Sequence, residues 1–476
     1  MNRRQNHGAS LLRGGPFSRL FWAGFITSTG DWAALFAQIT LAGAIGGATG
    51  ILVVLAARLL PGLVGGAIGG VLADRVSRKV VIVSADLLRG VVVLSLAFVE
   101  RLPELFAIAM LLEMLTLLGQ PARAAAIPHL VDENRLLGAN SLMLTAAYGT
   151  FPLGAAVSWM LGLLPPLNIL GIPATTEAKV FALDAVTFIA SGLILLTIPL
   201  GRARIRPERR RESPFDMRAP LRDLVEGMRF VGGSRQVRTV VFGMSIALVG
   251  GGILIVLGQG FVEDVLRADE AGFFAMLTAL GTGGAVGIAG LTFYGHALTR
   301  RDVAFGFALS ITGVALVAAS LVKTVPGGMG WMAVMGLGAG ASYVLGFTHL
   351  HEQVDHELQG RTFAALFSLM RAGLLASMAL ATAAVDVIDG RFRAPFDNAT
   401  RDVLFVGGVI VFVSGVGALW SRRSVFRRPR VSHEDLATLE EASQMATLIR
   451  GRAGTPPEDE DLRGSGEAGN GVEGER

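Results

Sequence analysis

Charged side chains recur inside the longest apolar stretches of this sequence. They are Asp31, Arg58, Asp86, Arg89, Glu113, Asp184 and Arg371. An ionised side chain is costly in hydrocarbon, so each of these must face a partner or a water-filled space. A carboxylate held in such surroundings can bind and release a proton near neutral pH. These positions are therefore candidates for proton-linked chemistry.

Two interpretations of these charges stay open. In the structural one they are simple ion pairs, with Asp31 on Arg58 and with Arg89 on Glu113 or on Asp86. Asp86 and Arg89 are three residues apart, so they can pair along one helix face.

In the functional interpretation, at least one acid takes up and releases a proton in each working cycle. We favour Asp31 for this role, then Glu113, with Asp86 as a further candidate. The basic residues that could partner these acids are Arg58, Arg89 and Arg371.

The composition places the chain in a membrane. Of 476 residues, 52% are hydrophobic and 17% are charged, with a mean hydropathy of +0.55. Soluble domains carry about 25% charged residues. We therefore expect no soluble domain that could hold an enzyme active site, and no nucleic-acid partner.

Missing residue types exclude further chemistry. The chain has no cysteine, which removes disulfides, thiolate metal sites and iron–sulfur clusters. No lysine follows a glycine, so the phosphate-binding loop of an ATP-driven motor is absent. The polar residues around His349 are expected to be solvated, and we expect no metal and no cofactor.

Long apolar stretches define the expected fold. A membrane helix needs about 20 mostly apolar residues. Twelve stretches meet this requirement, at 20–45, 50–72, 80–99, 105–126, 142–164, 178–200, 239–261, 272–297, 303–322, 328–349, 362–387 and 403–420. A weak internal repeat links the segments that end at Gly138 and Gly360, each of which precedes the fifth span of its half. We expect an all-α membrane protein with twelve transmembrane helices in two pseudo-symmetric six-helix bundles.

The same pattern predicts the domain organisation. We expect an N-terminal segment (1–19), a six-helix bundle (20–200), a central loop with an interfacial helix (201–238), a second bundle (239–421) and a largely disordered tail (422–476). Basic residues are concentrated in the first segment, the central loop, the tail and every second loop. Positive charge marks the cytoplasmic side of a membrane, so both termini are expected to be cytoplasmic.

The loop after the second span carries the most specific motif. The residues from Gly70 to Lys79 (GVLADRVSRK) resemble the signature G-x-x-x-D-[RK]-x-G-[RK]-[RK] of the major facilitator superfamily, with Ser77 where glycine is usual. Gly30-Asp31 and the segment around Arg123 add local matches. Together they resemble the exporter branch that includes enterobactin exporters and macrolide efflux proteins.

That resemblance implies a role for the loop. In the family such signatures brace a closed cytoplasmic gate against the start of the eleventh span. The residues concerned are Gly70, Asp74, Arg75, Arg78, Lys79, Arg123, Gly360 and Arg361. An acid facing a helix N-terminus is stabilised, so Asp74 could act as a latch between the halves. The alternative is that these basic residues only set the topology.

The fifth span resembles the antiporter signature of the same superfamily, G-x-x-x-G-P-x-x-G-G. The match rests on Gly149, Pro152 and Gly154, while Phe151 and an alanine pair replace other glycines. Proline frees a backbone carbonyl, and small residues let a second helix approach closely. The alternative is an ordinary kinked helix.

Polar and aromatic residues within the spans could line a central cavity. The candidates are Gln38, Tyr148, Trp159, Gln259, Phe293 and Tyr343. So few polar groups would suit a hydrophobic or amphipathic substrate. The alternative is helix packing or an aromatic belt at the membrane interface.

These features predict a secondary active transporter in the cell (inner or plasma) membrane. We expect it to export a hydrophobic or amphipathic small molecule, such as a drug, a macrolide-like compound or a siderophore. The expected mechanism is alternating access with proton antiport, by a monomer in the lipid bilayer. A lysophospholipid transporter of the same fold is the alternative, and a non-transporting membrane sensor or scaffold is a second one.

Overall fold

The computed structural model describes residues 11–64, 77–132, 135–165, 173, 175–199, 235–294, 298, 300–353, 356–391, 396 and 398–425. The chain divides into two units, Met1–Arg422 and Arg423–Arg476, and the helix packing and the candidate site belong to the first. The predicted interfacial helix of the central loop and the predicted disordered tail lie outside the described residues, apart from the tail's first four, 422–425, which continue a helix.

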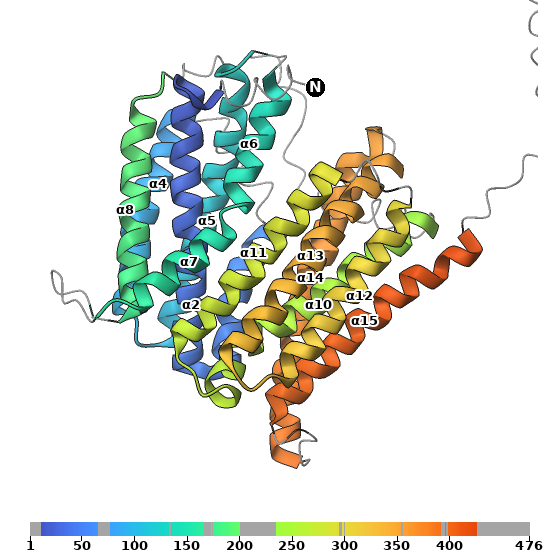
Figure 1. Cartoon of the computed structure of the whole chain (residues 1–476). Helices are drawn as coiled ribbons and strands as arrows, with labels where there is room; N and C mark the ends of the chain where they lie inside the picture. Colours follow the sequence, from blue (N-terminus) through green and yellow to red (C-terminus); the bar gives the residue numbers. More distant parts are fainter. Residues whose placement is uncertain are drawn as a thin grey trace, which may run out of the picture. The chain divides into compact units, whose positions relative to one another are not determined.

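All regular structure in the described part of the chain is helical, as Figure 1 shows. The main helices are α2 (Pro16–Val64), α4 (Arg78–Ser95), α5 (Leu102–Ala126), α6 (Leu136–Tyr148), α7 (Phe151–Gly162), α8 (Thr176–Leu196), α10 (Arg235–Gly260), α11 (Glu270–Tyr294), α12 (Arg301–Leu321), α13 (Val325–Gln353), α14 (His356–Arg391) and α15 (Ala399–Val425). A π-helical turn, Phe261–Val265, extends α10. The predicted all-α membrane fold is thereby confirmed.

Ten helices within the described ranges are long and apolar enough to cross a membrane. The count is consistent with twelve crossings for two local reasons. Helix α2 holds two predicted spans joined by a kink at Gly46 and Gly47, where Gly47 has φ +57°. That left-handed conformation favours glycine because it has no β-carbon.

The second reason is the predicted fifth span, which is broken into α6 and α7 at Gly149 and Thr150. Pro152, in the first turn of α7, has no N–H to donate to the carbonyl of Tyr148, so the helical hydrogen bonds cannot run through this point. Two residues earlier, the Thr150 hydroxyl donates to the Ala146 carbonyl oxygen at 2.9 Å. The stretch expected as the fifth span is therefore two helices at this point.

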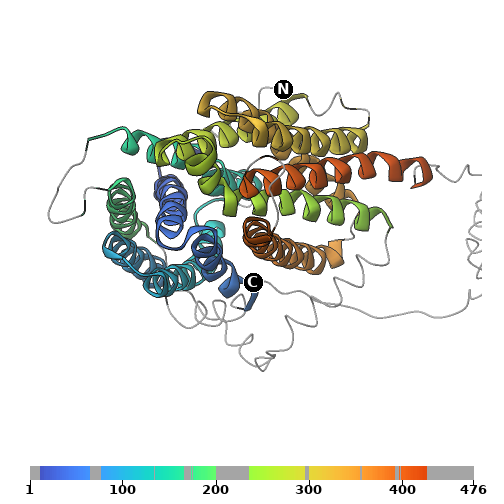
Figure 2. The ribbon, with the colours of Figure 1, turned by 90° about the horizontal axis from the view of Figure 1, so that it is seen from below.

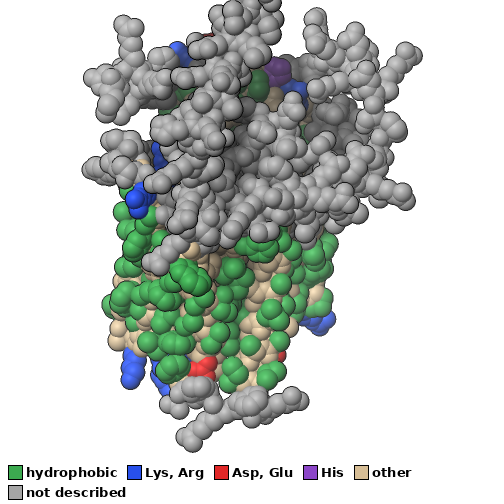
Figure 3. All heavy atoms as spheres, turned by 90° about the vertical axis from the view of Figure 1, so that its right-hand side faces the viewer, with side chains coloured by type: hydrophobic (Ala, Val, Ile, Leu, Met, Phe, Trp, Pro, Cys, Tyr) green, Lys and Arg blue, Asp and Glu red, His purple; other side chains and the backbone are tan. Residues whose placement is uncertain are grey.

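The outer surface of the helices is apolar. Figure 3 shows hydrophobic side chains over the described part of one face, with lysine and arginine side chains at its lower edge. Large side chains such as Val91 (68% exposed) and Leu380 (71% exposed) point away from the protein. A soluble protein would not expose so much apolar surface, whereas a bilayer favours it.

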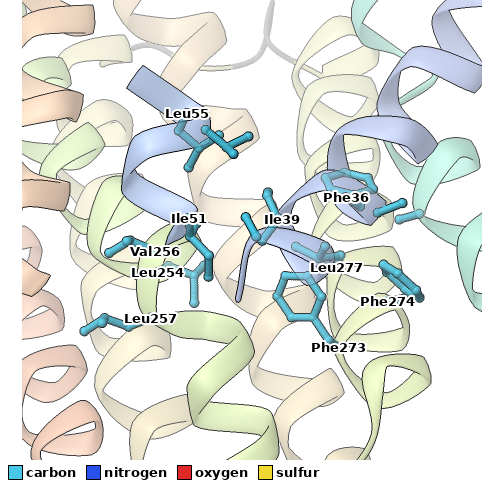
Figure 4. Close-up of a cluster of buried hydrophobic side chains, with 14 of the residues drawn as sticks. Phe36, Ile39, Ile51, Leu55, Leu254, Val256, Leu257, Phe273, Phe274 and Leu277 are labelled. Carbon is cyan, nitrogen blue, oxygen red and sulfur yellow. The ribbon is translucent and has the colours of Figure 1, made fainter. Parts of the chain in front are cut away.

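A buried apolar cluster joins helices that precede residue 200 to helices that follow residue 235. Figure 4 shows Ile51 of α2 beside Leu254 of α10, and Ile39 of α2 near Leu277 and Phe273 of α11. Helices α2 and α4 each pack against α5 and α8, and α11 and α12 each pack against α13 (Figures 1 and 2). Helix α2 also contacts α10 and α14, so it is the central helix of the unit.

Candidate functional site

A buried ion pair joins α2 to α4. The Arg89 Nη2 atom lies 2.5 Å from the Asp31 Oδ1 atom, and the two side chains are 9% and 30% exposed. The Arg89 guanidinium also lies over the Phe188 ring of α8, 4.2 Å from its centroid. This arrangement compensates the arginine charge with an anion and a π face.

A second ion pair joins α4 to α5. Arg123 contacts the Asp86 carboxylate, and the Ser191 hydroxyl of α8 donates to the same Asp86 oxygen at 2.6 Å. The partners therefore differ from the expected ones. Asp31 pairs with Arg89 and not with Arg58, and Asp86 pairs with Arg123 and not with Arg89.

Asp184 of α8 is a further buried acid. It is 1% exposed and accepts a hydrogen bond from the Thr187 hydroxyl at 2.9 Å. Its other oxygen has no hydrogen-bond partner among the described residues. The Asp184 carboxylate touches α2 at Gly30, where a β-carbon would collide with it. Asp184 thus lies within electrostatic range of both Asp31 and Arg89.

Glu113 of α5 has charged neighbours from three other helices. It lies within electrostatic range of Arg58, Arg89, Asp31 and Arg371. The Arg371 Nη1 atom of α14 donates to the Gly62 carbonyl oxygen of α2 at 3.0 Å. The Arg58 Nη1 atom is buried without a hydrogen-bond partner in the described structure. The structure therefore brings these sequence-predicted residues together, and it adds Gly62.

The antiporter-like segment lies between two other helices. A β-carbon on Gly154 of α7 would lie 2.8 Å from the Ala33 backbone nitrogen of α2, so only glycine fits. The Phe151 ring packs edge-on against Trp32, with 5.0 Å between centroids, and also meets Gly281 of α11. Helix α7 therefore contacts α2 on one side and α11 on the other.

The described part of the loop signature, Ser77 to Lys79, begins α4 and contacts the C-terminal ends of α5 and α8. Ser77 caps α4 by accepting a hydrogen bond from the Val80 backbone N–H. Arg78 donates to the Ala125 carbonyl oxygen at 3.2 Å, and Lys79 donates to that of Leu196 at 2.6 Å. Cations at helix C-termini interact favourably with the exposed carbonyls.

The predicted latch falls outside the described side chains. Gly70, Asp74 and Arg75 lie in 65–76, and Gly360 and Arg361 are described only as backbone of α14. The predicted contact between them stays a prediction.

The candidate cavity residues fall into two groups according to burial. Gln38 and Gln259 are buried, and Gln259 Nε2 donates to the Thr40 carbonyl oxygen of α2 at 3.2 Å. Tyr148 and Tyr343 are exposed, and the two phenols lie within electrostatic range of one another. The Gln259 contact therefore joins α10 to α2, while the tyrosines carry no such buried contact among the described residues.

Sequence reasoning missed a pair of acids. The Glu270 carboxyl, in the first turn of α11, lies close to the Glu177 carboxyl and to Thr176, in the first turn of α8. Each acid alone looks like an ordinary helix start, so the sequence offers no sign of their contact.

Apolar membrane-spanning helices with buried, paired charges at mid-helix define a polytopic membrane protein built for transport. A family model of the Major Facilitator Superfamily matches residues 20–378. The chain therefore belongs to the Major Facilitator Superfamily and is a transporter of that family.

Curated relatives agree with this assignment. The chain is 25% identical over 322 residues to the MFS-type transporter YfiS of Bacillus subtilis (strain 168), covering 59% of this chain and 73% of that protein. It is 24% identical over 375 residues to the putative bacilysin exporter BacE of Bacillus amyloliquefaciens, covering 78% and 87%.

Solved structures share the fold. A bacterial homolog of the human lysosomal transporter Spinster aligns with a TM-score of 0.66 at 14% identity, over 86% of this chain and 98% of that one. The nucleoside transporter NupG aligns with a TM-score of 0.63 at 12% identity, over 85% and 99%.

Proposed function

We propose that this transporter exports an amphipathic small molecule across the cell membrane by alternating access, in exchange for protons. The orientation that goes with this proposal has both termini in the cytoplasm and a single chain as the working unit. The export direction is supported by the exporter-named relative and by the antiporter-like helix α7.

The observation that carries the proton coupling is the sharing of Arg89 among three acids. Arg89 is bonded to Asp31 and lies within electrostatic range of Asp86 and Asp184. When Asp31 takes up a proton, the Phe188 ring still lies against the Arg89 guanidinium, and Asp86 and Asp184 remain within electrostatic range of it. Protonation of Asp31 therefore does not leave an isolated buried cation, which would be costly.

A short path links this acid to the contact between α7 and α11. Trp32 follows Asp31 in α2, and its Nε1 atom donates to the Ala147 carbonyl oxygen of α6 at 2.9 Å. The Trp32 ring packs on Phe151, which meets α11 at Gly281. A shift of α2 on protonation would act directly on that contact.

Inside-out vesicles test the proposal. With an imposed pH gradient, the wild-type protein should accumulate ethidium, and adding ethidium should release protons that a pH-sensitive fluorophore detects. Asp31→Asn should abolish the proton release, and Glu113→Gln should reduce it. The exposed acid Asp264 gives a matched control, since Asp264→Asn removes a carboxylate at a helix end without altering coupling. Retention of proton release in both Asp31→Asn and Glu113→Gln would falsify the assignment, and accumulation only in right-side-out vesicles would reverse the direction.

A further inference from the structure

Three charged side chains of the central helices lack the salt bridges that join α2, α4 and α5. Arg58, Glu113 and Arg371 form no salt bridge with any residue that the structure describes, whereas Asp31, Asp86, Arg89 and Arg123 are all paired. All three are partly buried within membrane-spanning segments. A charge at this depth needs a counter-charge, and no described residue supplies one in contact.

The two arginines approach the same face of α2. Gly62 follows Arg58 by four residues, which is about 6 Å along the helix axis on the same side. Arg371 of α14 places its Nη1 atom on the Gly62 carbonyl oxygen at 3.0 Å. The Arg371 guanidinium of α14 therefore contacts α2 one helical turn after Arg58, and both arginines lie within electrostatic range of Glu113.

Glycine at position 62 makes this approach possible. A β-carbon there would lie 2.8 Å from Arg371 Nη1 and 3.1 Å from Cζ, so a side chain would push the guanidinium away. A guanidinium has five N–H donors, and the Gly62 carbonyl uses one of them. The buried Arg58 Nη1 atom has no acceptor in the described structure. Donors thus remain for a planar oxyanion, which arginine binds with two parallel hydrogen bonds.

Glu113 adds an acid within electrostatic range of the two arginines. Its electrostatic neighbours are Arg58 on α2, Arg89 on α4, Asp31 on α2 and Arg371 on α14. Arg89 is already bonded to Asp31, so Arg58 and Arg371 are the two cations near Glu113 without a bonded acid among the described residues. Such a pair of cations and a nearby anion complement a molecule that carries an oxyanion and a protonated amine.

We infer that Arg58 and Arg371 bind an oxyanion, carboxylate or phosphate, of the transported molecule, and that Glu113 binds its protonated amine. The molecules that bind best are thus zwitterionic and amphipathic, and a cation such as ethidium, which lacks the oxyanion, is a weaker substrate. This inference rests on the proposed function, and it adds a reason for exchange. The Glu113 carboxylate can hold either the substrate amine or a proton, so proton uptake there releases the substrate.

The test uses purified full-length protein and a matched set of probes. The zwitterionic dipeptide alanyl-phenylalanine is compared with its methyl ester, which lacks the carboxylate, and with its N-acetyl form, which lacks the amine. Binding is measured by ligand-induced shift of the thermal unfolding midpoint. Each capped form should bind about tenfold or more weakly, because one charged hydrogen-bonded contact is lost.

Variants assign the two charges to their residues. Arg58→Gln and Arg371→Gln should each weaken dipeptide binding about tenfold and remove the preference over the methyl ester. Glu113→Gln should remove the preference over the N-acetyl form. Arg371→Lys keeps the charge and should retain part of the preference. Arg101→Gln removes an exposed arginine at the start of α5 and should change nothing.

A further arm identifies the source of the oxyanion. Lysophosphatidylcholine, whose headgroup is zwitterionic, is offered in place of the dipeptide. Binding of this lipid alone, lost in Arg58→Gln, supports an oxyanion site that serves a lipid phosphate. Equal binding of the dipeptide and its methyl ester overturns the inference. A preference for the dipeptide over the ester that neither arginine variant changes also overturns it. Ethidium exchange that persists in such a case leaves the proposed export standing, so the two failures are distinguishable.

Discussion

The helices before residue 200 and those after residue 235 are held together by different contacts. In the first group, α4 is tied to α2 by Asp31 and Arg89 and to α5 by Asp86 and Arg123. In the second group, the described charged side chains lie near helix ends, apart from Arg371. There the helices approach one another closely at glycine residues. Gly336 of α13 is an example, because it lies against the Leu280 carbonyl oxygen of α11 and leaves no room for a β-carbon.

The difference teaches which half can respond to protons. A buried ion pair depends on the charge of both partners, so proton uptake changes the energy of contacts in the first group. A contact between a glycine and a backbone carbonyl has no titratable group, and it depends on shape alone. We therefore expect the first group to be the switch and the second group to be the rigid counterpart, with Arg371 as its charged contribution to the substrate site.

The largest expected effect comes from breaking a buried ion pair in the first group. Asp86→Asn leaves the Arg123 guanidinium buried without an anion, at an expected cost of about 3–5 kcal/mol. The thermal unfolding midpoint of the purified protein in detergent measures this loss. The double variant with Arg123→Gln removes both charges and should recover much of the stability. If Asp86→Asn were as stable as the wild type, this ion pair would not be what holds the first group of helices together.

A smaller effect is expected from a methyl group in the second group. Gly336→Ala places a β-carbon against the Leu280 carbonyl oxygen, and forcing the helices apart should cost about 1–3 kcal/mol. Gly330 lies in the same helix with no atom within 4 Å of an added β-carbon, so Gly330→Ala is the matched control. Alanine favours a helix over glycine, so the control should be neutral or stabilising. Equal unfolding midpoints for the two variants would contradict close packing at Gly336.

The smallest effect is expected at the surface. Lys79→Met removes the hydrogen bond to the Leu196 carbonyl oxygen at the end of α8, at an expected cost of about 0.3–1 kcal/mol. Salt screens an exposed charge, so the difference in unfolding midpoint should shrink at high ionic strength. The buried Asp86 contact should be insensitive to the same salt. A salt-independent loss at Lys79 would mean that the side chain acts through packing.

Much of the fold could be predicted because the membrane imposes it. Spans such as 105–126 and 303–322 coincide with α5 and α12 within a few residues, since a stretch of about 20 apolar residues leaves the backbone little choice but a helix. The break at Gly149 was signalled by Pro152, because a missing N–H is a local property.

The partners of the buried charges could not be predicted in the same way. Arg89 is three residues from Asp86, which suggests a pair within α4, yet it bonds Asp31 of α2. Which side chains meet depends on how the helices are rotated and displaced against one another. Gly30 shows the limit clearly, because its role beside Asp184 is visible only once α2 and α8 are packed.

Sequence alone therefore determined the class of this protein: a helical membrane transporter with ionisable groups at mid-membrane, because hydropathy, charge and the loop motif are local. Only the tertiary structure decided that Asp31 belongs to Arg89, that Arg371 reaches Gly62 across helices, and that Arg58 and Glu113 have no salt-bridge partner among the described residues. These are contacts of a few ångströms between segments far apart in the chain. They are set by the packing of whole helices, which no short stretch of sequence encodes.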